Sequence, residues 1–300
     1  MPEEEELISV VIPCYERRGI VARAVASALA QRGVQTQIIL CDDGSTDGTW
    51  EDWEHDSRVL YLRLPHRGAC AARNAGIDAA LGKWIAFLDS DDTWQSTKLR
   101  DQLALIRATG ADAVCSSFHR HDGEDVTLAP SAERISGTIE PKDLLTGNLV
   151  STQTILGRTD LIRQVRFDES LSRFQDWDFA MRLARAGQLW YDAAPTADVY
   201  LQRDSISRRP ELGLKSLPVI YERSAGLYRS SLRGTLAWQD HVYMLTSGCE
   251  EDGHALYRMS FDPARPLKDR VRVRLHAAAL RIRHRAVYHW REATKRRRCR

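Results

Sequence analysis

Acidic side chains crowd one short stretch of the sequence, WIAFLDSDDTW at residues 84–94. An apolar run, 84–88, is followed directly by Asp89, Ser90, Asp91 and Asp92. Carboxylates held this close repel one another, and burial raises the cost unless a cation compensates them. Mg²⁺ and Mn²⁺ suit such oxygens and bind through one or two side chains together with substrate phosphates. The stretch therefore indicates either a metal–diphosphate site or a turn whose aspartates cap a helix.

Two further acidic pairs stand at the boundaries of apolar segments. Asp42 and Asp43 end TQIILCDD (36–43), and Asp176 and Asp178 open DWDFAMRLARAG (176–187). The latter segment has apolar residues at helical spacing, which predicts an amphipathic helix from Asp176 to Gly187. An aspartate at a helix start is typical of an N-cap, and this interpretation applies to Asp176.

The elements that position these carboxylates alternate between strands and helices. Strands are expected at 8–13, 36–43, 59–64, 84–89 and 111–118, with helices between them after Gly19, after Asp47, and at 68–82 and 98–110. This alternation predicts an α/β fold with a doubly wound sheet. Ligands bind such sheets at the carboxyl ends of the strands, so the clusters at 42–43 and 89–92 are expected at one edge.

The second part of the chain has a looser pattern. HRHDGEDVTL indicates a hairpin, PKDLLTGN and RTDLIRQV indicate short helices, and the chain from about 210 is expected to be mostly helical. We therefore expect a catalytic domain at 1–207 and a helical extension at 208–300.

The end of the chain is strongly basic, with fourteen Lys and Arg from 265 to 300 against two acidic residues. Val271, Leu275, Ala278 and Ile282 form one apolar stripe among the arginines. This pattern favours either peripheral contact with an anionic membrane through 265–300 or a helix packed on the domain with a solvated basic face. Nucleic acid is disfavoured as a partner, since no recognition motif accompanies the charge.

Composition indicates an ordinary globular protein, with 43% hydrophobic and 28% charged residues and a net charge of +2. No apolar run approaches the ~20 residues that span a bilayer, and no signal peptide is evident. The six cysteines form no CxxC pair, which favours reduced thiols and a cytoplasmic location. If the basic end binds lipid, that location is expected to be peripheral, at the inner face of the membrane.

Five ordered motifs give the chain a specific resemblance. They are SVVIPCYER (9–17), CDDGSTDGT (41–49), HRGACAARNAGIDAALGKWIAFLDSDDTW (66–94), FDESLSRFQDWDFAMRLAR (167–185) and YLQRDSIS (200–207). Together they resemble the inverting family 2 glycosyltransferases, which have the GT-A nucleotide-sugar-binding fold, a mixed sheet of Rossmann type. The resemblance covers roughly residues 7–207.

The resemblance implies a role for each matching residue. Asp176 would be the general base, and Asp91 would coordinate Mn²⁺ or Mg²⁺. Tyr15 would lie beside the nucleobase of the donor, and Asp43 would accept a hydrogen bond from the N–H of uracil or thymine. Asp42 would support the loop that carries Asp43. The implied nucleotide-sugar contacts are Pro13, Tyr15, Asp42, Asp43, Arg73, Asn74, Asp89, Ser90 and Arg203.

Structural alternatives exist for several of these positions. Tyr15 is otherwise a packing aromatic, Asp42 and Asp43 turn formers, and Arg73 and Asn74 a solvated helix face. Trp94 and Trp177 are either packing residues or walls of an acceptor site.

The sequence departs from the family pattern at two places. Gln175 stands where many members have Glu before the base, which changes the local charge and leaves the base itself. Gln202, Arg203 and Asp204 stand where many members have a His near the diphosphate, so Arg203 would have to pair with phosphate. The QxxRW motif of processive synthases is absent, which favours transfer of a single sugar.

The expected function is a metal-dependent, inverting transfer from a nucleoside-diphosphate sugar, UDP- or dTDP-linked, to a hydroxyl of a glycan or lipid-linked acceptor in the synthesis of cell-envelope polysaccharide. One alternative is a sugar-phosphate nucleotidyltransferase, although PCYERRG lacks the Gly-rich loop which that chemistry uses. The other is a catalytically silent nucleotide-sugar-binding scaffold that docks to membranes.

Overall fold

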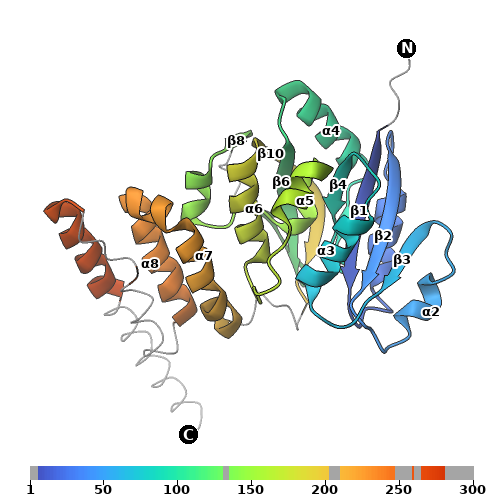
Figure 1. Cartoon of the computed structure of the whole chain (residues 1–300), viewed down its shortest axis with the longest axis horizontal. Coiled ribbons are helices and arrows are strands. Elements are labelled where there is room, and N and C mark those ends of the chain that lie inside the picture. Colours follow the sequence, from blue (N-terminus) through green and yellow to red (C-terminus); the bar gives the residue numbers. More distant parts are fainter. Residues whose placement is uncertain (1–5, 131–134, 203–209, 247–258, 260–264, 281–300) are drawn as a thin grey trace, which may run out of the picture. The chain divides into compact units, whose positions relative to one another are not determined.

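A computed structural model of the chain describes residues 6–130, 135–202, 210–246, 259 and 265–280 (Figure 1). The chain forms two compact units. Unit 1 comprises 1–141, 148–171 and 175–203, and unit 2 comprises 142–147, 172–174 and 204–300.

Unit 1 is built on a ten-stranded mixed sheet with the order β3-β2-β1-β4-β9-β6-β10-β5, to which β7 and β8 are added beside β6 and β10. The strands are β1 Leu7–Cys14, β2 Gln35–Asp42, β3 Val59–Arg63, β4 Trp84–Phe87, β5 Thr93–Trp94, β6 Ala113–Asp122, β7 Asp125–Ala129, β8 Gly137–Ile139, β9 Leu156–Arg158 and β10 Leu189–Tyr200. This arrangement confirms the predicted α/β fold with a mixed, doubly wound sheet.

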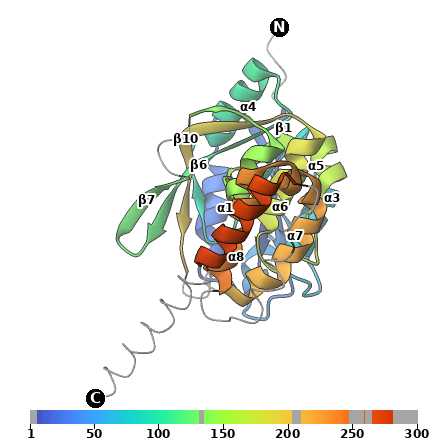
Figure 2. The ribbon, with the colours of Figure 1, turned by 90° about the vertical axis from the view of Figure 1, so that its left-hand side faces the viewer.

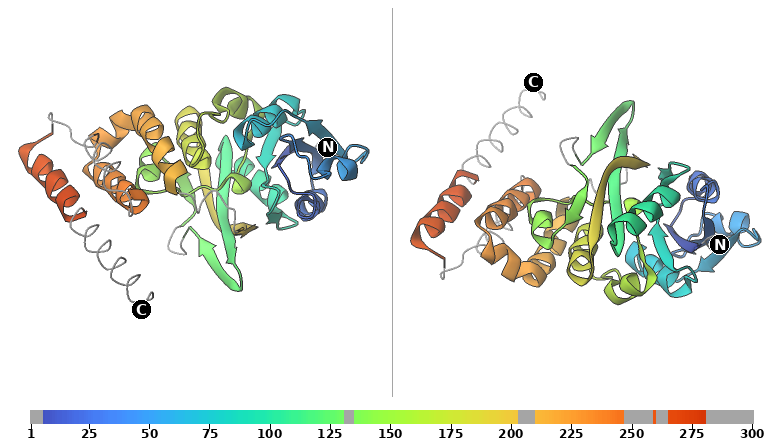
Figure 3. Two further views of the ribbon diagram at one scale, coloured as in Figure 1. Left: turned by 90° about the horizontal axis from the view of Figure 1, so that it is seen from below. Right: turned by 90° about the horizontal axis from the view of Figure 1, so that it is seen from above.

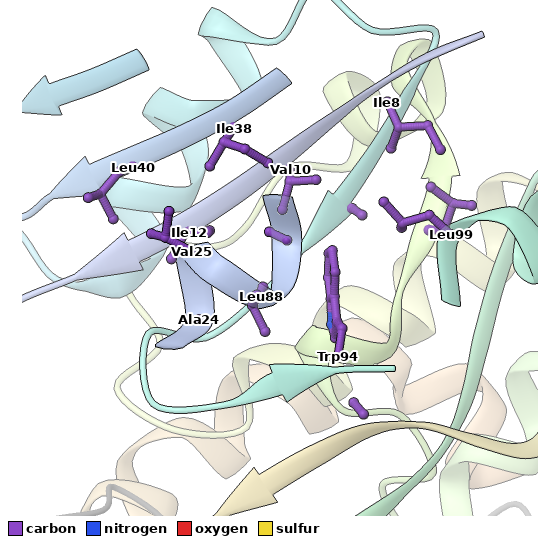
Figure 4. Packing of buried hydrophobic residues seen from close by; sticks show 14 of the residues in the cluster. Ile8, Val10, Ile12, Ala24, Val25, Ile38, Leu40, Leu88, Trp94 and Leu99 are labelled. Atoms are coloured by element: carbon purple, nitrogen blue, oxygen red, sulfur yellow. The ribbon is translucent and has the colours of Figure 1, made fainter. Parts of the chain in front are cut away.

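Helices lie on both faces of this sheet. They are α1 Val21–Leu29, α2 Thr49–Trp53, α3 Ala69–Ala79, α4 Lys98–Thr109, α5 Thr159–Val165 and α6 Gln175–Ala186, with the 3₁₀ turn η2 Thr152–Thr154. A second 3₁₀ turn, η1 Pro141–Thr146, belongs to unit 2 from residue 142 onward. The even-numbered residues of β1, Ile8, Val10 and Ile12, pack with α1 and Trp94 on one face (Figure 4). On the other face, α3 contacts β1 and β2.

Parallel pairing around β1 brings the acidic ends of two strands to one edge. β1 pairs with β2 from Leu7↔Gln35 to Cys14↔Asp42, and with β4 from Ile8↔Trp84 to Val11↔Phe87. All three strands run in the same direction, so the residues after β2 and after β4 leave the sheet at its carboxyl edge. The expectation that 42–43 and 89–92 share an edge is confirmed.

Several element boundaries differ from the prediction. The strand expected at 111–118 continues to Asp122 and turns into β7, so the predicted hairpin is the β6–β7 ribbon seen in Figure 2. The helix expected to start at Asp176 starts at Gln175. β9 was not predicted, because a strand of three residues is too short to show a periodic pattern. It lies antiparallel between β4 and β6.

Close approach of α3 to the sheet depends on a glycine. A Cβ atom on Gly76 would lie 2.3 Å from Cγ1 of Val11 and 2.9 Å from Sγ of Cys41. Packing at this density leaves no room for a methyl group, so only glycine lets α3 come this close to β1 and β2. The position of α3 in turn fixes Arg73 and Asn74, which lie on the same helix.

Unit 2 is helical in its described part, as predicted. It contains α7 Pro210–Ser230, α8 Leu232–Thr246 and a helix at 267–280 (Figure 3, orange to red). Its core is aromatic: Tyr221, Tyr228 and Trp238 are buried, with ring centroids 4.6–5.6 Å apart. Of the six cysteines, Cys14, Cys41, Cys70 and Cys115 are buried free thiols, as expected, and the other two lie outside the described residues.

We predict that Gly76→Ala destabilises the protein by about 2 kcal/mol, because the added methyl group overpacks the contact between α3 and β1. The matched control is Gly226→Ala in α7, where a Cβ meets nothing within 4 Å. That change is expected to be neutral or to stabilise its helix by up to about 1 kcal/mol. Denaturant unfolding of both variants measures the difference, and equal midpoints would contradict the packing argument.

Candidate active site

The two aspartates at the end of β2, Asp42 within the strand and Asp43 directly after it, are buried and bind different loops. Asp42 accepts the backbone N–H of Ser45 at 2.8 Å through Oδ1, and the hydroxyl of Tyr61 through Oδ2. Asp43 accepts the N–H groups of Arg67 and Gly68, both at 2.8 Å. The two carboxylates therefore hold the loops after β2 and after β3 at the sheet edge.

An aromatic platform lies next to Asp43. Tyr15, which follows β1, is 43% exposed and stacks on His66 with ring centroids 4.2 Å apart. His66 Nδ1 lies 2.9 Å from an Asp43 carboxylate oxygen. Pro13 is buried within β1, one residue before Cys14, whose carbonyl accepts the N–H of Asp43. An exposed ring beside a carboxylate acceptor has the chemistry needed to stack and hydrogen-bond a planar base.

Arg73 of α3 joins the end of β4 to the start of α6. Its guanidinium is 6% exposed, forms an ion pair with Asp89 at 2.6 Å, and donates to Oε1 of Gln175 at 3.2 Å. Its Nε has no hydrogen-bond partner within the described part of the chain. Arg73 therefore does not form the solvated helix face considered from the sequence, and in this structure it compensates the charge of Asp89.

The other two aspartates of the DSDD segment lack such a partner. No Lys, Arg or His of the described residues forms an ion pair with Asp91 or Asp92. Burial and the charge of Asp89 raise the pKa of Asp91, and burial with Asp89 and Asp91 raises the pKa of Asp92. Asp92 accepts the N–H of Tyr200 at 2.9 Å, and Ser90, between Asp89 and Asp91 in the sequence, is buried.

Asp176 lies in the first turn of α6 with both carboxylate oxygens engaged. Oδ1 accepts the N–H of Trp177 at 2.8 Å, and Oδ2 accepts Nδ2 of Asn148 at 2.8 Å. Burial is the largest influence and raises the pKa of Asp176, with Asp89 adding to the increase, while the Asn148 bond and Arg73 lower it. A carboxylate with a raised pKa, held by one neutral side chain, is suited to accept a proton.

Other expected residues have packing or structural contacts. Asn74 is buried, and its amide binds the backbone of Phe167 in both directions, at 2.9 and 3.0 Å. Its expected contact with ribose or phosphate stays a prediction. Trp94 and Trp177 are buried, which favours packing over acceptor walls. Asp178 pairs with Arg182 at 2.7 Å, and Arg203 lies outside the described residues.

The metal expected at Asp91 fits the donor set at the end of β4. Within the described ranges, no three His, Cys, Asp or Glu side chains are grouped so as to hold an ion by themselves. Mg²⁺ and Mn²⁺ do not need such a cage, since they share ligands with substrate phosphates. The raised pKa values of Asp91 and Asp92 mark negative charge that a bound cation would offset.

Three contributors to the site were not found from the sequence. Asn148 holds Asp176, His66 stacks on Tyr15, and Arg23 of α1 donates to the backbone carbonyl of Asp91 and lies 4.1 Å from the ring of Tyr200. His66 is the first residue of a motif that was recognised, HRGACAARN, and its membership of that motif was the available signal. Asn148 is the last residue of PKDLLTGN, which predicted a short helix but carried no signal of a contact with Asp176.

Comparison with known proteins agrees with this geometry. The sequence model described as Glycosyl transferase family 2 matches residues 9–168. The chain is 42% identical over 104 residues to UDP-Glc:alpha-D-GlcNAc-diphosphoundecaprenol beta-1,3-glucosyltransferase WfaP of Escherichia coli. The aligned segment covers 34% of this chain and 41% of that protein. It is 32% identical over 217 residues to the succinoglycan biosynthesis protein ExoO of Rhizobium meliloti, covering 67% and 62%. The chain thus spans less than two thirds of either relative.

Solved structures support the fold independently of the sequence. The crystal structure of S. aureus TarS 1-349 in complex with UDP-GlcNAc is similar with a TM-score of 0.64 at 16% identity, covering 95% of this chain and 92% of that one. At this identity the likeness concerns the fold, which is the GT-A fold expected from the motifs. Because the family model matches more than half of the 300 residues, the chain belongs to glycosyl transferase family 2.

Proposed function

We propose that this chain transfers one sugar from a UDP-sugar to a hydroxyl of a lipid-linked glycan, with inversion at the anomeric carbon. One observation supports this most directly. Arg73 links Asp89, at the end of β4, to Gln175, the neighbour of Asp176, so the donor-side carboxylates and the base belong to one network. The printed names of relatives add support, since WfaP is described as using UDP-Glc and TarS was crystallised with UDP-GlcNAc.

The donor is expected to occupy the edge between β2 and β4. Its base would stack on Tyr15 and donate an N–H to Asp43, its ribose would meet Asp89, and its diphosphate would lie near Asp91 and, through the segment after β10, Arg203. Uracil and thymine each carry a ring N–H that can donate to the carboxylate of Asp43, whereas a nucleobase that presents no N–H there cannot form this hydrogen bond. The same reasoning retains dTDP as an alternative to UDP.

The acceptor is expected to be a polyprenyl-diphosphate-linked sugar. WfaP is described as acting on alpha-D-GlcNAc-diphosphoundecaprenol, and ExoO as a succinoglycan biosynthesis protein. We accordingly place the protein in cell-envelope polysaccharide synthesis at the cytoplasmic face of the membrane. In the described residues no helix is long and apolar enough to cross a bilayer.

The chemistry assigned to the chain's own residues is a single displacement. The carboxylate of Asp176 takes the proton from the acceptor hydroxyl while that oxygen forms a bond to the anomeric carbon. The bond from this carbon to the diphosphate oxygen breaks, and the nucleoside diphosphate leaves on the opposite face. Asn148 and the N–H of Trp177 hold the base in position. Asp91 would hold Mn²⁺ or Mg²⁺, which supplies charge stabilisation for the departing diphosphate when bound.

We also propose that residues 1–207 form the catalytic domain and that 208–300 form a helical extension. The break between the two compact units after residue 203 supports this division, although short segments at 142–147 and 172–174 group with the helical unit.

We predict that Asp91→Asn abolishes Mn²⁺-assisted binding of UDP. For the wild type, UDP with Mn²⁺ should raise Tm in proportion to the logarithm of ligand concentration over affinity. The variant should bind at least about tenfold more weakly while its ligand-free Tm is unchanged or higher, because a charge disfavoured by burial has been removed. The control is Asp101→Asn, an exposed acid in α4. Equal Mn²⁺-dependent increases in Tm with UDP in both variants would refute the assignment of Asp91 as a metal ligand.

We predict that Asp176→Asn lowers kcat by about 10²–10⁴-fold, the range typical of a general base, with little change in UDP affinity. The measurement is release of UDP from a panel of UDP-sugars in the presence of lipid-linked acceptors. Release of pyrophosphate instead would identify a nucleotidyltransferase, and binding without any turnover would identify a silent scaffold.

We predict that Asn148→Ala moves the acid limb of the kcat/KM–pH profile to higher pH. The base is active when deprotonated, so activity is lost as the pH falls through the folded pKa of Asp176, which lies above 3.8. The Asn148 bond favours the charged form, and its removal raises that pKa further. A limb that stays in place while kcat falls would assign Asn148 a role other than tuning the base.

A further inference from the structure

The helix at 267–280 exposes apolar side chains at regular spacing. Leu267, Val271 and Leu275 are 68%, 45% and 64% exposed. A spacing of four residues places them along one side of the helix, over more than two turns. This stripe, which we call the outer stripe, includes two of the residues that the sequence pattern placed together, Val271 and Leu275.

The opposite side of the same helix is packed within unit 2. Val273, Ala277 and Leu280 are 0–4% exposed. His276 Nε2 lies 2.9 Å from the carboxylate of Asp240 in α8. The helix is therefore already docked by one face, and the outer stripe is not the face that its own unit uses for packing. The sequence offered two alternatives for this segment, contact with a membrane or packing on the protein. The packed face accounts for the second alternative, and the outer stripe is the side to which the first would apply.

Arg265 fixes where this helix begins. Its buried guanidinium donates to the carbonyls of Tyr228 and Ser231 at 2.9 and 3.3 Å, to the carbonyl of Arg229, and to Oγ1 of Thr235 at 2.6 Å. These groups lie at the end of α7 and the start of α8, so Arg265 satisfies carbonyls that a helix end leaves unpaired. The outer stripe is thus presented in a defined orientation.

Positive charge borders the outer stripe on both sides. Lys268 and Arg272 each follow a stripe residue, and Arg274 precedes one, and all three are exposed. Asp269 is the one acidic residue between 267 and 280, and it is not fully exposed. Long basic side chains beside an apolar stripe can extend to phosphate groups while the apolar side chains enter the acyl boundary. A protein partner would instead need acidic groups on both borders of an apolar ridge.

We propose that the outer stripe with Lys268, Arg272 and Arg274 docks on the surface of an anionic phospholipid bilayer. This inference rests on the proposed function, because it brings the enzyme to the membrane in which a lipid-linked acceptor resides. The attraction has two parts: burial of Leu267, Val271 and Leu275 at the interface, and the basic residues, each of which contributes about fivefold in affinity near an anionic surface. The contribution of apolar burial persists at high salt concentration, whereas the electrostatic attraction of the basic residues is screened.

The test is co-sedimentation of the full chain with vesicles of phosphatidylcholine, alone or mixed with phosphatidylglycerol. The variant Leu267→Gln/Leu275→Gln removes apolar area without changing charge. We expect about a tenfold loss of binding to the mixed vesicles. The matched control is Leu60→Gln/Leu81→Gln, which alters two leucines that are 42% and 79% exposed in unit 1 and should bind as the wild type does.

Two results would overturn the proposal. One is equal binding of both double variants, which would assign any vesicle binding to charge elsewhere in the chain. The other is a shift from dimer to monomer in Leu267→Gln/Leu275→Gln by light scattering, which would identify a second copy as the occupant. Vesicle binding is measured without turnover, so its failure is distinguishable from failure of the proposed transferase reaction.

Discussion

Convergence of negative charge at one edge of a parallel sheet is the constraint on which the rest of unit 1 depends. Parallel pairing of β2, β1 and β4 forces Asp42, Asp43 and the DSDD segment to the same edge. Different groups compensate the charge of each carboxylate. Asp42 accepts the N–H of Ser45 and the hydroxyl of Tyr61, and Asp43 accepts the N–H of Arg67. Asp89 forms an ion pair with Arg73. Within the described ranges no basic side chain forms an ion pair with Asp91, although the charges of Arg17 and Arg23 act against the rise in its pKa that burial and Asp89 cause.

Helix α3 is the element that makes this compensation possible. Gly76 allows it to approach β1 closely enough for Arg73, one turn earlier, to be buried against Asp89. A buried guanidinium is acceptable only where its charge and its N–H groups find partners, and Asp89 and Gln175 supply them. The same helix uses Asn74 to fasten the backbone at Phe167, whose ring stacks on Phe179 of α6 at 4.2 Å. Packing and site geometry are therefore set by one helix.

The sequence was sufficient to predict features that depend on local pattern and chain direction. Buried apolar runs located the strands, and the alternation of elements placed both acidic clusters at one edge. It was insufficient where long-range contacts decide. Lys98, the first residue of a predicted helix, is fully buried, donates to Oε1 of Gln102 at 2.7 Å, and its Nζ lies 4.3 Å from the ring centre of Trp94. Burial lowers the pKa of the Lys98 amine well below its usual value, and no local pattern in the sequence indicated this environment.

Gln175 shows how a departure from the family pattern fits the electrostatics of this chain. Its Oε1 accepts from Arg73 at 3.2 Å, and its Nε2 donates to the carbonyl of Leu171 at 2.9 Å, so both ends of the amide are used. A glutamate here would lose the second bond and would compete with Asp89 for the single charge of Arg73. It would also add a negative charge beside Asp176, whose pKa burial already raises. A neutral residue at 175 therefore leaves the charge of Arg73 to Asp89 and avoids a further rise in the pKa of Asp176.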